Sequence, residues 1–262
     1  MKAPLRSSVE QAIIRNIQAV EEELKEATGE RQKEVKAQLL DLKQMLSSLQ
    51  HEPVTPTDAP VKEAFKDGQG EPFLELRLFR ALVSKYADII NDFEKKTVGE
   101  IKGMVNPDDL SVQSVLQGIK SEQYDFESGF EENAKKAFEF VKEEIGFVKP
   151  DIDVNFWLSP HELLKEKAGD DKDIAVFLCS LLAGLGDENA EVIVCELSDG
   201  STHAVVSTEK SGKFFIFDAT QKHGFEYFSG KKEEVFDRYS FNNAKITRFL
   251  YRFNRQKYEQ FI

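Results

Sequence analysis

An α+β fold is predicted for this chain of 262 residues from two patterns that follow one another along the sequence. Apolar residues recur at helical spacing over residues 8–145, and short apolar runs separated by turn residues begin after residue 190. Between them, residues 172–185 form an almost wholly apolar helical segment, typical of a buried helix. We expect a three- to five-stranded antiparallel sheet packed on this helix, with helices from 73–145 around it.

Residues 1–50 are predicted to be helical and coiled-coil-like. Two narrow apolar stripes run along residues 8–27 and 35–49, and they are out of phase, with Thr28-Gly29 between them. A helical hairpin that turns at Gly29 and one long helix with a stutter both fit this pattern. The stripes suit either packing on the chain's own domain or contact with a partner, including a homo-oligomer through residues 8–50, and the sequence leaves both open.

Composition divides the chain into five segments. Further helices are expected at 73–96, 110–119 and 131–145, with a loop at 121–129. The predicted organisation is a helical segment at 1–50, a linker rich in proline and glycine at 51–72, a helical lead-in at 73–129, a core at 130–225 and an extension with a basic aromatic segment at 226–262.

The start of the apolar helix carries the first candidate functional residue. Ser159-Pro160-His161-Glu162 opens a preceding helix with a capping box, and Gly169 is expected to end it in the left-handed conformation. Asp170 and Asp171 then cap the apolar helix, and helical spacing turns Asp171 towards the side of Ile174. The helix dipole favours a carboxylate at this position.

Two polar residues stand at the ends of the strands that follow. Asp199-Gly200 signals a hairpin, His203 opens the second strand and Asp218 closes the third. The expected strands contain Val192–Cys195, His203–Val206 and Phe214–Phe217.

These motifs, in this order, resemble the transglutaminase-like superfamily, a papain-like fold of cysteine hydrolases and acyltransferases. The resemblance covers about residues 130–225 and implies a helix packed centrally on the sheet. It also implies a Cys-His-Asp triad, whose cysteine opens that helix. His203 and Asp218 match two triad positions, but Asp171 stands in place of the nucleophilic cysteine, and Ala219 stands where the family usually has proline. The matching motifs are Trp157-x-Ser159-Pro160-x-Glu162-x-Leu164, Gly169-Asp170-Asp171-Lys172-Asp173-Ile174-Ala175, His203-Ala204-Val205-Val206 and Asp218-Ala219-Thr220.

The replaced cysteine leads us to predict a catalytically inactive domain with a degenerate triad of Asp171, His203 and Asp218. A carboxylate attacks an amide poorly compared with a thiolate, so the domain is expected to be a binding or scaffold module for a protein or peptide, without cofactor or metal. The alternative is an enzyme with altered chemistry, a hydrolase that uses the three residues as general base or metal ligands. A mainly structural role centred on residues 8–50 is a third hypothesis.

The two cysteines, Cys179 and Cys195, lie in apolar stretches and are expected to be core residues. Neither matches the nucleophile position, and two cysteines cannot form a disulfide framework.

Charge and hydropathy limit partners and location. The net charge of −12 argues against nucleic acid binding. No apolar run is long enough to span a membrane and no signal-peptide pattern is present, so we expect a cytoplasmic protein. Residues 245–255 fit either a basic amphipathic helix or a strand.

Overall fold

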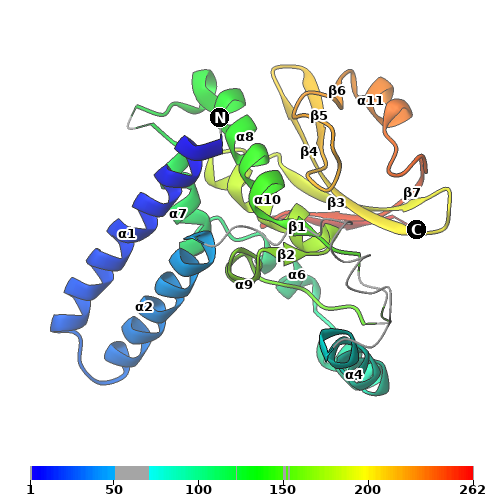
Figure 1. Ribbon diagram of the computed structural model, residues 1–262. Helices are drawn as coiled ribbons and strands as arrows, with labels where there is room; N and C mark the ends of the chain where they lie inside the picture. Colours follow the sequence, from blue (N-terminus) through cyan, green and yellow to red (C-terminus); the bar gives the residue numbers. More distant parts are fainter. Residues whose placement is uncertain (1, 51–70, 122, 150–151, 153, 262) are drawn as a thin grey trace.

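A computed structural model describes residues 2–121, except 51–70, and residues 123–261, except 150, 151 and 153 (Figure 1). Helices and sheet are mixed, as predicted. The helices are α1 (Lys2–Glu26), α2 (Gly29–Gln50), α4 (Glu71–Lys85), α5 (Ala87–Phe93), α6 (Val98–Met104), α7 (Leu110–Ile119), α8 (Phe126–Glu144), α9 (Pro160–Glu166), α10 (Asp171–Gly184) and α11 (Lys232–Arg238). The strands are β1 (Gly146–Phe147), β2 (Ala168–Gly169), β3 (Glu191–Leu197), β4 (Thr202–Lys210), β5 (Lys213–Phe217), β6 (Ser229–Gly230), β7 (Ile246–Phe253) and β8 (Tyr258–Gln260).

Helices α1 and α2 form the hairpin alternative, which turns at Gly29 in the left-handed conformation (φ 61°). The apolar stripes pack within the chain, because α1 lies against α7 and α2 lies against α9. The Arg6 guanidinium on α1 also donates to the carbonyl of Leu49 at the end of α2. The stripe residues buried in this way are Val9, Ile13, Ile17, Val35, Leu42 and Leu49.

Helix α1 lies close against α7 at Gly118, and this contact gives a first testable prediction. A Cβ at Gly118 would lie 2.8 Å from the Cα of Val9, inside a normal non-bonded contact, and a backbone cannot move aside as a flexible side chain does. We expect Gly118→Ala to lower the free energy of unfolding by about 1–3 kcal/mol, measured by urea denaturation. Gly103→Ala on α6, where a Cβ would meet no described atom within 4 Å, is the control and should be neutral or stabilising by up to about 1 kcal/mol. Equal destabilisation by both substitutions would contradict the close approach.

The main sheet has six strands in the order β6-β5-β4-β3-β7-β8, and every neighbouring pair is antiparallel. The prediction of three to five strands was therefore too low, because the C-terminal segment forms β7 and β8 rather than a basic helix. Arg248 and Arg252 on β7 form ion pairs with Glu196 and Glu191 on β3, which places basic side chains beside acidic ones.

The two faces of the sheet are both covered, and α10 covers one of them. Strand side chains alternate between faces, so one set packs against α10 and the other against the α11 region. The first set contains Val192, Val194, Ala204, Val206, Phe215 and Phe217. The second contains Ile193, Cys195, Val205, Phe214 and Ile216, packed with Val235 and Tyr239. Helices α7 and α8 also contact α10.

Several predicted boundaries need correction. Asp125 caps α8 by accepting from the Ser128 backbone N–H at 3.0 Å, so part of the predicted loop at 121–129 is helical. The predicted helix at 73–96 divides at Tyr86 into α4 and α5. Lys167, with φ 55°, is the left-handed residue after α9 in place of Gly169, where a side chain would instead clash with Leu163.

The predicted linker at 51–72 lies outside the described residues, apart from residues 71–72, which begin α4. No helix in the described part of the chain has both the length and the apolar composition to cross a membrane.

Candidate functional site

The N-terminus of α10 is fixed by a reciprocal cap. Asp170 accepts from the backbone N–H groups of Lys172 and Asp173, and Asp173 accepts in return from the Asp170 backbone N–H. The second oxygen of Asp173 accepts from the Leu158 backbone N–H at 2.9 Å. The segment before α9 is thereby tied to the start of α10, and Asp171 becomes the first residue of that helix.

Asp173 is a buried acid in this cap. Burial, with the nearby charge of Asp170, raises the pKa of the Asp173 carboxyl to about 7, although the N–H groups of Leu158 and Asp170 and the charge of Lys172 oppose the shift. The Asp173 carboxyl therefore exchanges its proton near neutral pH.

Asp171 reaches from the first turn of α10 to the beginning of β4. Its Oδ2 accepts from the Ala204 backbone N–H at 2.8 Å and lies 2.8 Å from Nδ1 of His203. The pairing of β4 with β5 begins only at Val206, so the Asp171 carboxylate provides the acceptor that Ala204 lacks from a neighbouring strand. This contact fixes the register of the helix end against the strand.

His203 lies between two carboxylates and is 2% exposed. Its Nδ1 faces Asp171, its Nε2 lies 3.0 Å from Oδ2 of Asp218, and the Phe241 ring stacks on it at 3.9 Å. A carboxylate can only accept, so both ring nitrogens donate and the ring is an imidazolium. Burial lowers the pKa of the His203 imidazole, but the hydrogen bonds and charges of the two carboxylates outweigh burial and raise it to about 9.

Asp218 is a buried carboxylate whose two oxygens are both occupied. Besides His203, Oδ2 accepts from the Tyr239 hydroxyl and the Gln221 side-chain amide, both at 2.7 Å. The other oxygen accepts from the backbone and hydroxyl of Thr220. Burial raises the pKa of the Asp218 carboxyl, but the hydrogen bond and charge of His203, together with the other donors, hold it below its usual range.

The structure brings together all three residues that the sequence placed at the site, and their arrangement restricts the available chemistry. A histidine that acts as general base needs one ring nitrogen free to take a proton. In His203 both nitrogens already donate to carboxylates. Asp171 and Asp218 lie at opposite ring nitrogens, so a single ion could not be ligated by all three side chains, and the described residues contain no group of three or more metal-ligating side chains.

Neither cysteine supplies a nucleophile. Cys195 pairs directly with His203 across β3 and β4, and its Sγ donates to the His203 carbonyl at 3.4 Å. Burial raises the pKa of the Cys195 thiol to about 12, and burial likewise raises the pKa of Cys179 within α10. Both remain thiols at neutral pH and behave as core residues, as expected.

Three residues at the site were not predicted from sequence. Tyr239 and Phe241 belong to the segment after residue 225 that was assigned to an extension, and Gln221 lies in the turn after β5. No local pattern distinguishes them from other aromatic or polar residues. Only the folding of α11 back over the sheet brings Tyr239 and Phe241 to His203 and Asp218.

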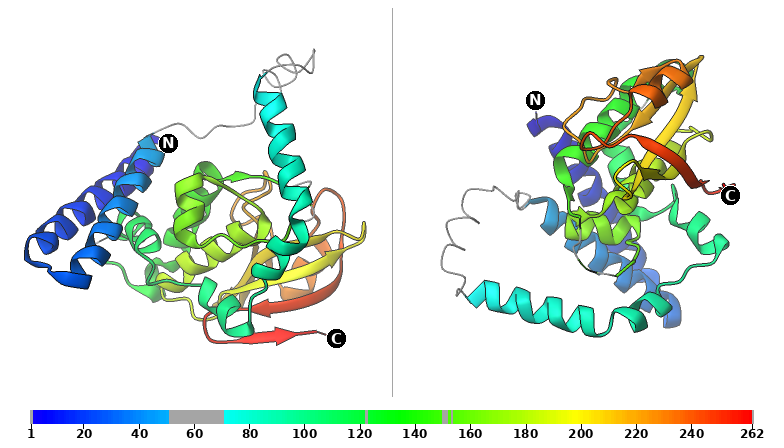
Figure 2. Two further views of the ribbon diagram at one scale, coloured as in Figure 1. Left: turned by 90° about the horizontal axis from the view of Figure 1, so that it is seen from below. Right: turned by 90° about the vertical axis from the view of Figure 1, so that its right-hand side faces the viewer.

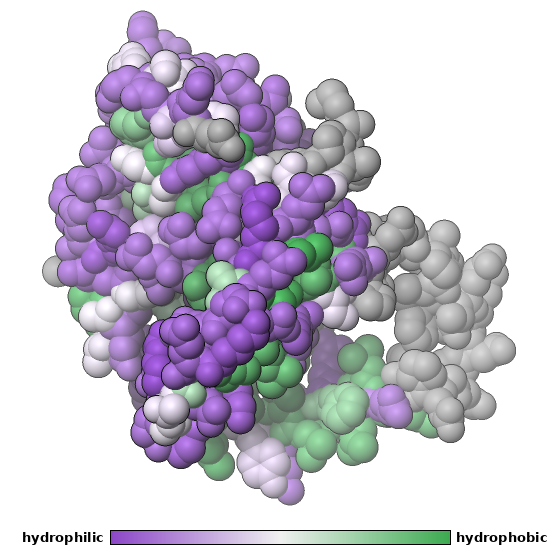
Figure 3. Space-filling model, turned by 90° about the vertical axis from the view of Figure 1, so that its left-hand side faces the viewer, coloured by the Kyte–Doolittle hydropathy of each residue, from purple (hydrophilic) through white to green (hydrophobic). Residues whose placement is uncertain are grey.

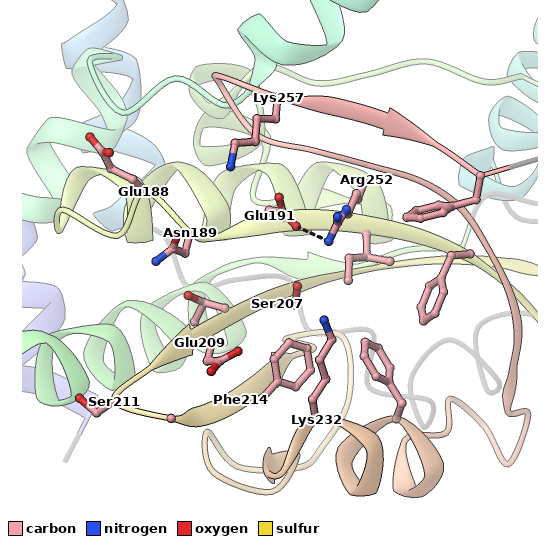
Figure 4. Close-up of a pocket in the computed structure, with 16 residues that line it drawn as sticks. Glu188, Asn189, Glu191, Ser207, Glu209, Ser211, Phe214, Lys232, Arg252 and Lys257 are labelled. Carbon is pink, nitrogen blue, oxygen red and sulfur yellow. Dashed lines mark hydrogen bonds and ion pairs between the residues drawn. The ribbon is translucent and has the colours of Figure 1, made fainter.

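Two depressions adjoin the sheet. One, of about 570 Å³, opens beside Asp171 and His203 and is also lined by Lys172, Phe241 and Tyr251. The other, of about 630 Å³, lies away from the triad between β4, β7 and α11 (Figure 4). Charged and aromatic side chains line the second groove, including Glu209, Phe214, Lys232, Phe249 and Arg252. We assign the candidate site to the first depression, because it alone of the two reaches the triad.

Comparison with known proteins supports the resemblance seen in the motifs. Residues 155–246 match the family model described as the CEP76 peptidase-like domain, which supports a papain-like family for this part of the chain. No curated protein matches the chain.

Solved structures of Legionella pneumophila LapG are also similar. The EGTA-treated form matches at 15% sequence identity and a TM-score of 0.41, covering 64% of this chain and 87% of LapG. The calcium-bound form matches at 16% identity and a TM-score of 0.38, covering 57% of this chain and 85% of LapG.

Proposed function

We propose that this chain carries a catalytically inactive, transglutaminase-like domain that works as a protein- or peptide-binding module. The observation that carries the proposal is the Asp171–His203–Asp218 arrangement, in which an imidazolium is enclosed between two carboxylates. The matching family model describes a peptidase-like domain. Peptide hydrolysis by a cysteine nucleophile would need a thiolate at position 171, where this chain has an aspartate.

In this proposal Asp171 has exchanged a chemical role for a structural one. The helix N-terminus that would activate a thiol by lowering its pKa also favours a carboxylate. Asp171 uses that position to accept from Ala204 and His203 and so holds α10 on β4. The ring stays protonated and the cleft beside it keeps its shape without turnover.

The cleft is the surface that we propose for binding. It combines the exposed edge of the triad with aromatic residues Phe147, Phe241 and Tyr251 and the basic residue Lys149. An extended peptide that offers apolar side chains to the aromatic wall fits this chemistry. Cytoplasmic location, the absence of a nucleic acid partner and the division into segments at 50, 72, 129 and 225 stay predictions.

Restoring the missing thiol tests the proposal. Asp171→Cys would place a thiol beside His203, with Asp218 behind the ring. We expect iodoacetamide at pH 6 to label this variant at least about tenfold faster than a free cysteine, because a thiol paired with an imidazolium at a helix N-terminus has a lowered pKa. Mass spectrometry would locate the label. The natural chain is the control, because Cys179 and Cys195 are buried and should stay unlabelled.

Two results would count against the proposal. Slow labelling of Asp171→Cys would show that residue 171 does not occupy an activating position. Hydrolysis of p-nitroanilide or thioester probes by the natural chain, lost in a folded His203→Asn variant, would show that the triad is catalytic as it stands.

A further inference from the structure

The second groove, of about 630 Å³, lies on the face of the main sheet that α11 covers only in part (Figure 4). Its floor contains Ile193 on β3 and Ser207 on β4, each 5% exposed. Helix α11 has seven residues and packs on Val205 and Ile216 through Val235, so the sheet face beyond it stays open. The volume is typical of a small-molecule site. The strands and helix that line the groove lie at the end of the molecule opposite the hairpin of α1 and α2 (Figure 2), whose outer face is mostly hydrophilic (Figure 3).

A row of four phenylalanine rings lines this groove. Phe214 on β5 contacts Phe236 on α11, with ring centroids 5.2 Å apart. Phe236 contacts Phe249 on β7 at 5.1 Å, and Phe249 contacts Phe261 after β8 at 6.0 Å. All four residues belong to the groove lining, so the row offers one continuous apolar surface. Such a surface takes up aliphatic or aromatic groups through hydrophobic and dispersion contacts.

Cations stand at both ends of the row, and one of them has no acidic partner. Arg252 lies over Phe261, 5.7 Å from the ring centroid, and its guanidinium already forms ion pairs with glutamates on β3 and β8. At the other end, Nζ of Lys232 lies 5.5 Å from the ring centroid of Phe214. In the described part of the chain, Lys232 has no carboxylate within 4 Å. The row therefore begins at a cation that can accept an anionic partner.

Two further donors face the groove. The Ser207 hydroxyl makes no hydrogen bond to a described residue, although Ser207 is buried. Lys257, in the turn between β7 and β8, also lacks a carboxylate within 4 Å among the residues that the structure describes. Figure 4 shows the ammonium groups of Lys232 and Lys257 directed into the groove from opposite walls, with the Ser207 oxygen between them in this view. Ammonium and hydroxyl groups in such an arrangement are donors for a carboxylate.

The remaining charges of the groove favour a ligand with a single negative charge. Glu188 and Glu209 also line it, and neither has a basic group within 4 Å in the described ranges. These two acids nearly cancel the two lysines. Attraction to the lysines grows in proportion to the charge of a ligand, whereas the desolvation cost of an ion grows with the square of its charge. A monoanionic carboxylate is therefore favoured over a phosphate dianion.

The floor of the groove favours a small molecule over an extended peptide. Strands β3 and β4 are interior strands, and each is paired with a neighbour on both sides at Ile193 and Ser207. Their backbone groups are therefore not available to a peptide, which would leave its own N–H and C=O groups without strand partners. An acyl chain or aromatic ring has no such groups and can lie directly on the apolar floor.

We propose that the second groove binds a small apolar monocarboxylic acid. Lys232 and the Ser207 hydroxyl donate to its carboxylate, Lys257 adds positive charge from the opposite wall, and its apolar part lies along the phenylalanine row. The proposal does not depend on the degenerate triad, because none of Asp171, His203 and Asp218 lines this groove.

Titration of the ¹⁵N-labelled full chain with octanoate, followed by amide chemical shifts, tests the proposal. We expect a dissociation constant below about 1 mM, with the largest shifts around Ser207 and Phe214. We expect 1-octanol, which has the same chain without the charge, to bind at least about tenfold more weakly. Lys232→Met should raise the octanoate constant at least about tenfold and leave the 1-octanol constant unchanged, a difference that a general loss of groove shape would not produce.

Two further variants complete the experiment. Lys231→Met is the matched control, because Lys231 precedes Lys232, pairs with Glu234 and is not part of the groove lining; it should change the octanoate constant less than about twofold. Phe261→Ala should weaken octanoate and 1-octanol alike, by about threefold or more, because it shortens the apolar row. Far-UV circular dichroism would confirm that the variants are folded.

Several outcomes would overturn the proposal. A dissociation constant for octanoate above about 1 mM, equal binding of octanoate and 1-octanol, or an unchanged octanoate constant in Lys232→Met would each do so. Tighter binding of octyl phosphate than of octanoate would contradict the preference for a single charge. Tighter binding of N-acetyl-Phe-Phe with a free carboxyl group would identify a peptide C-terminus as the ligand in place of a small acid.

Discussion

Asp218→Ala is expected to lower the free energy of unfolding by about 3–5 kcal/mol, because it removes one of the two carboxylates that pair with the buried His203 imidazolium and leaves two buried donors without an acceptor. The imidazolium of His203 would lose the acceptor for its Nε2–H, and the buried Tyr239 hydroxyl would lose its acceptor as well. The alanine side chain would also leave an empty space beside the imidazole of His203 and the hydroxyl of Tyr239. Urea denaturation at pH 7, followed by far-UV circular dichroism, would measure the loss.

The control for this prediction is Asp237→Ala on α11, an aspartate that is exposed to solvent. Its replacement should change stability by less than about 0.5 kcal/mol, as is usual for surface positions. Asp218→Asn keeps an acceptor oxygen but loses the charge, so it should fall between the two alanine variants. If Asp218→Ala costs no more than Asp237→Ala, the enclosed imidazolium does not stabilise the fold.

Stability is expected to fall by about 3 kcal/mol as the pH rises from about 6.5 to above 9. The pKa of His203 is about 9 in the folded chain, against about 6.5 in the unfolded chain. The folded state therefore holds the proton more tightly. Its contribution is complete below pH 6.5 and is lost as the ring loses its proton near pH 9. Thermal unfolding at a series of pH values would show the decline.

A His203→Asn variant is the control, because it has no proton to lose in this range and its stability should be nearly flat from pH 7.5 to 9. The pKa of Asp173 is about 7 in the folded chain, against about 3.9 in the unfolded chain. Asp173 therefore causes a separate loss of stability as the pH rises from about 4 to 7. Asp173→Asn should remove that part only. If the stability of His203→Asn falls above pH 7.5 as much as that of the natural chain, the assignment to His203 is wrong.

Acidification should also destabilise the chain, because Asp218 gains a proton. The pKa of Asp218 lies below its usual range in the folded state. Its contribution is therefore present above about pH 4 and is lost as the pH falls further. His203 and Asp218 together therefore favour the folded state most strongly between about pH 4 and pH 6.5.

Short sequence motifs, together with the family that they resemble, were sufficient to predict the parts of the site that lie on single elements. The apolar spacing of residues 174–185 predicted α10, and the resemblance of the motifs to the transglutaminase-like superfamily predicted that Asp171, His203 and Asp218 would meet. These predictions succeed because each side chain is positioned by its own helix or strand end. The structure brings the three together, while their functional role remains a proposal.

The remaining features depend on contacts between distant segments. The segment that forms β7 fits both a helical and a strand period, and it becomes a strand because β3 offers both backbone partners and the acidic residues Glu191 and Glu196. Gly29 fits a hairpin or a stutter, and packing of α1 on α7 and of α2 on α9 favours the hairpin. Tyr239 reaches Asp218 only after α11 has folded over the sheet.

The place of β3 in the sheet has a consequence for synthesis on the ribosome. β3 pairs on one side with β4, which follows almost immediately, and on the other side with β7, whose residues lie some fifty positions later. Until residues 246–253 have emerged, one backbone edge of β3 has no partner, and such an edge invites pairing with other chains. Nascent chains arrested between β5 and β7 should therefore be the species that most needs a chaperone.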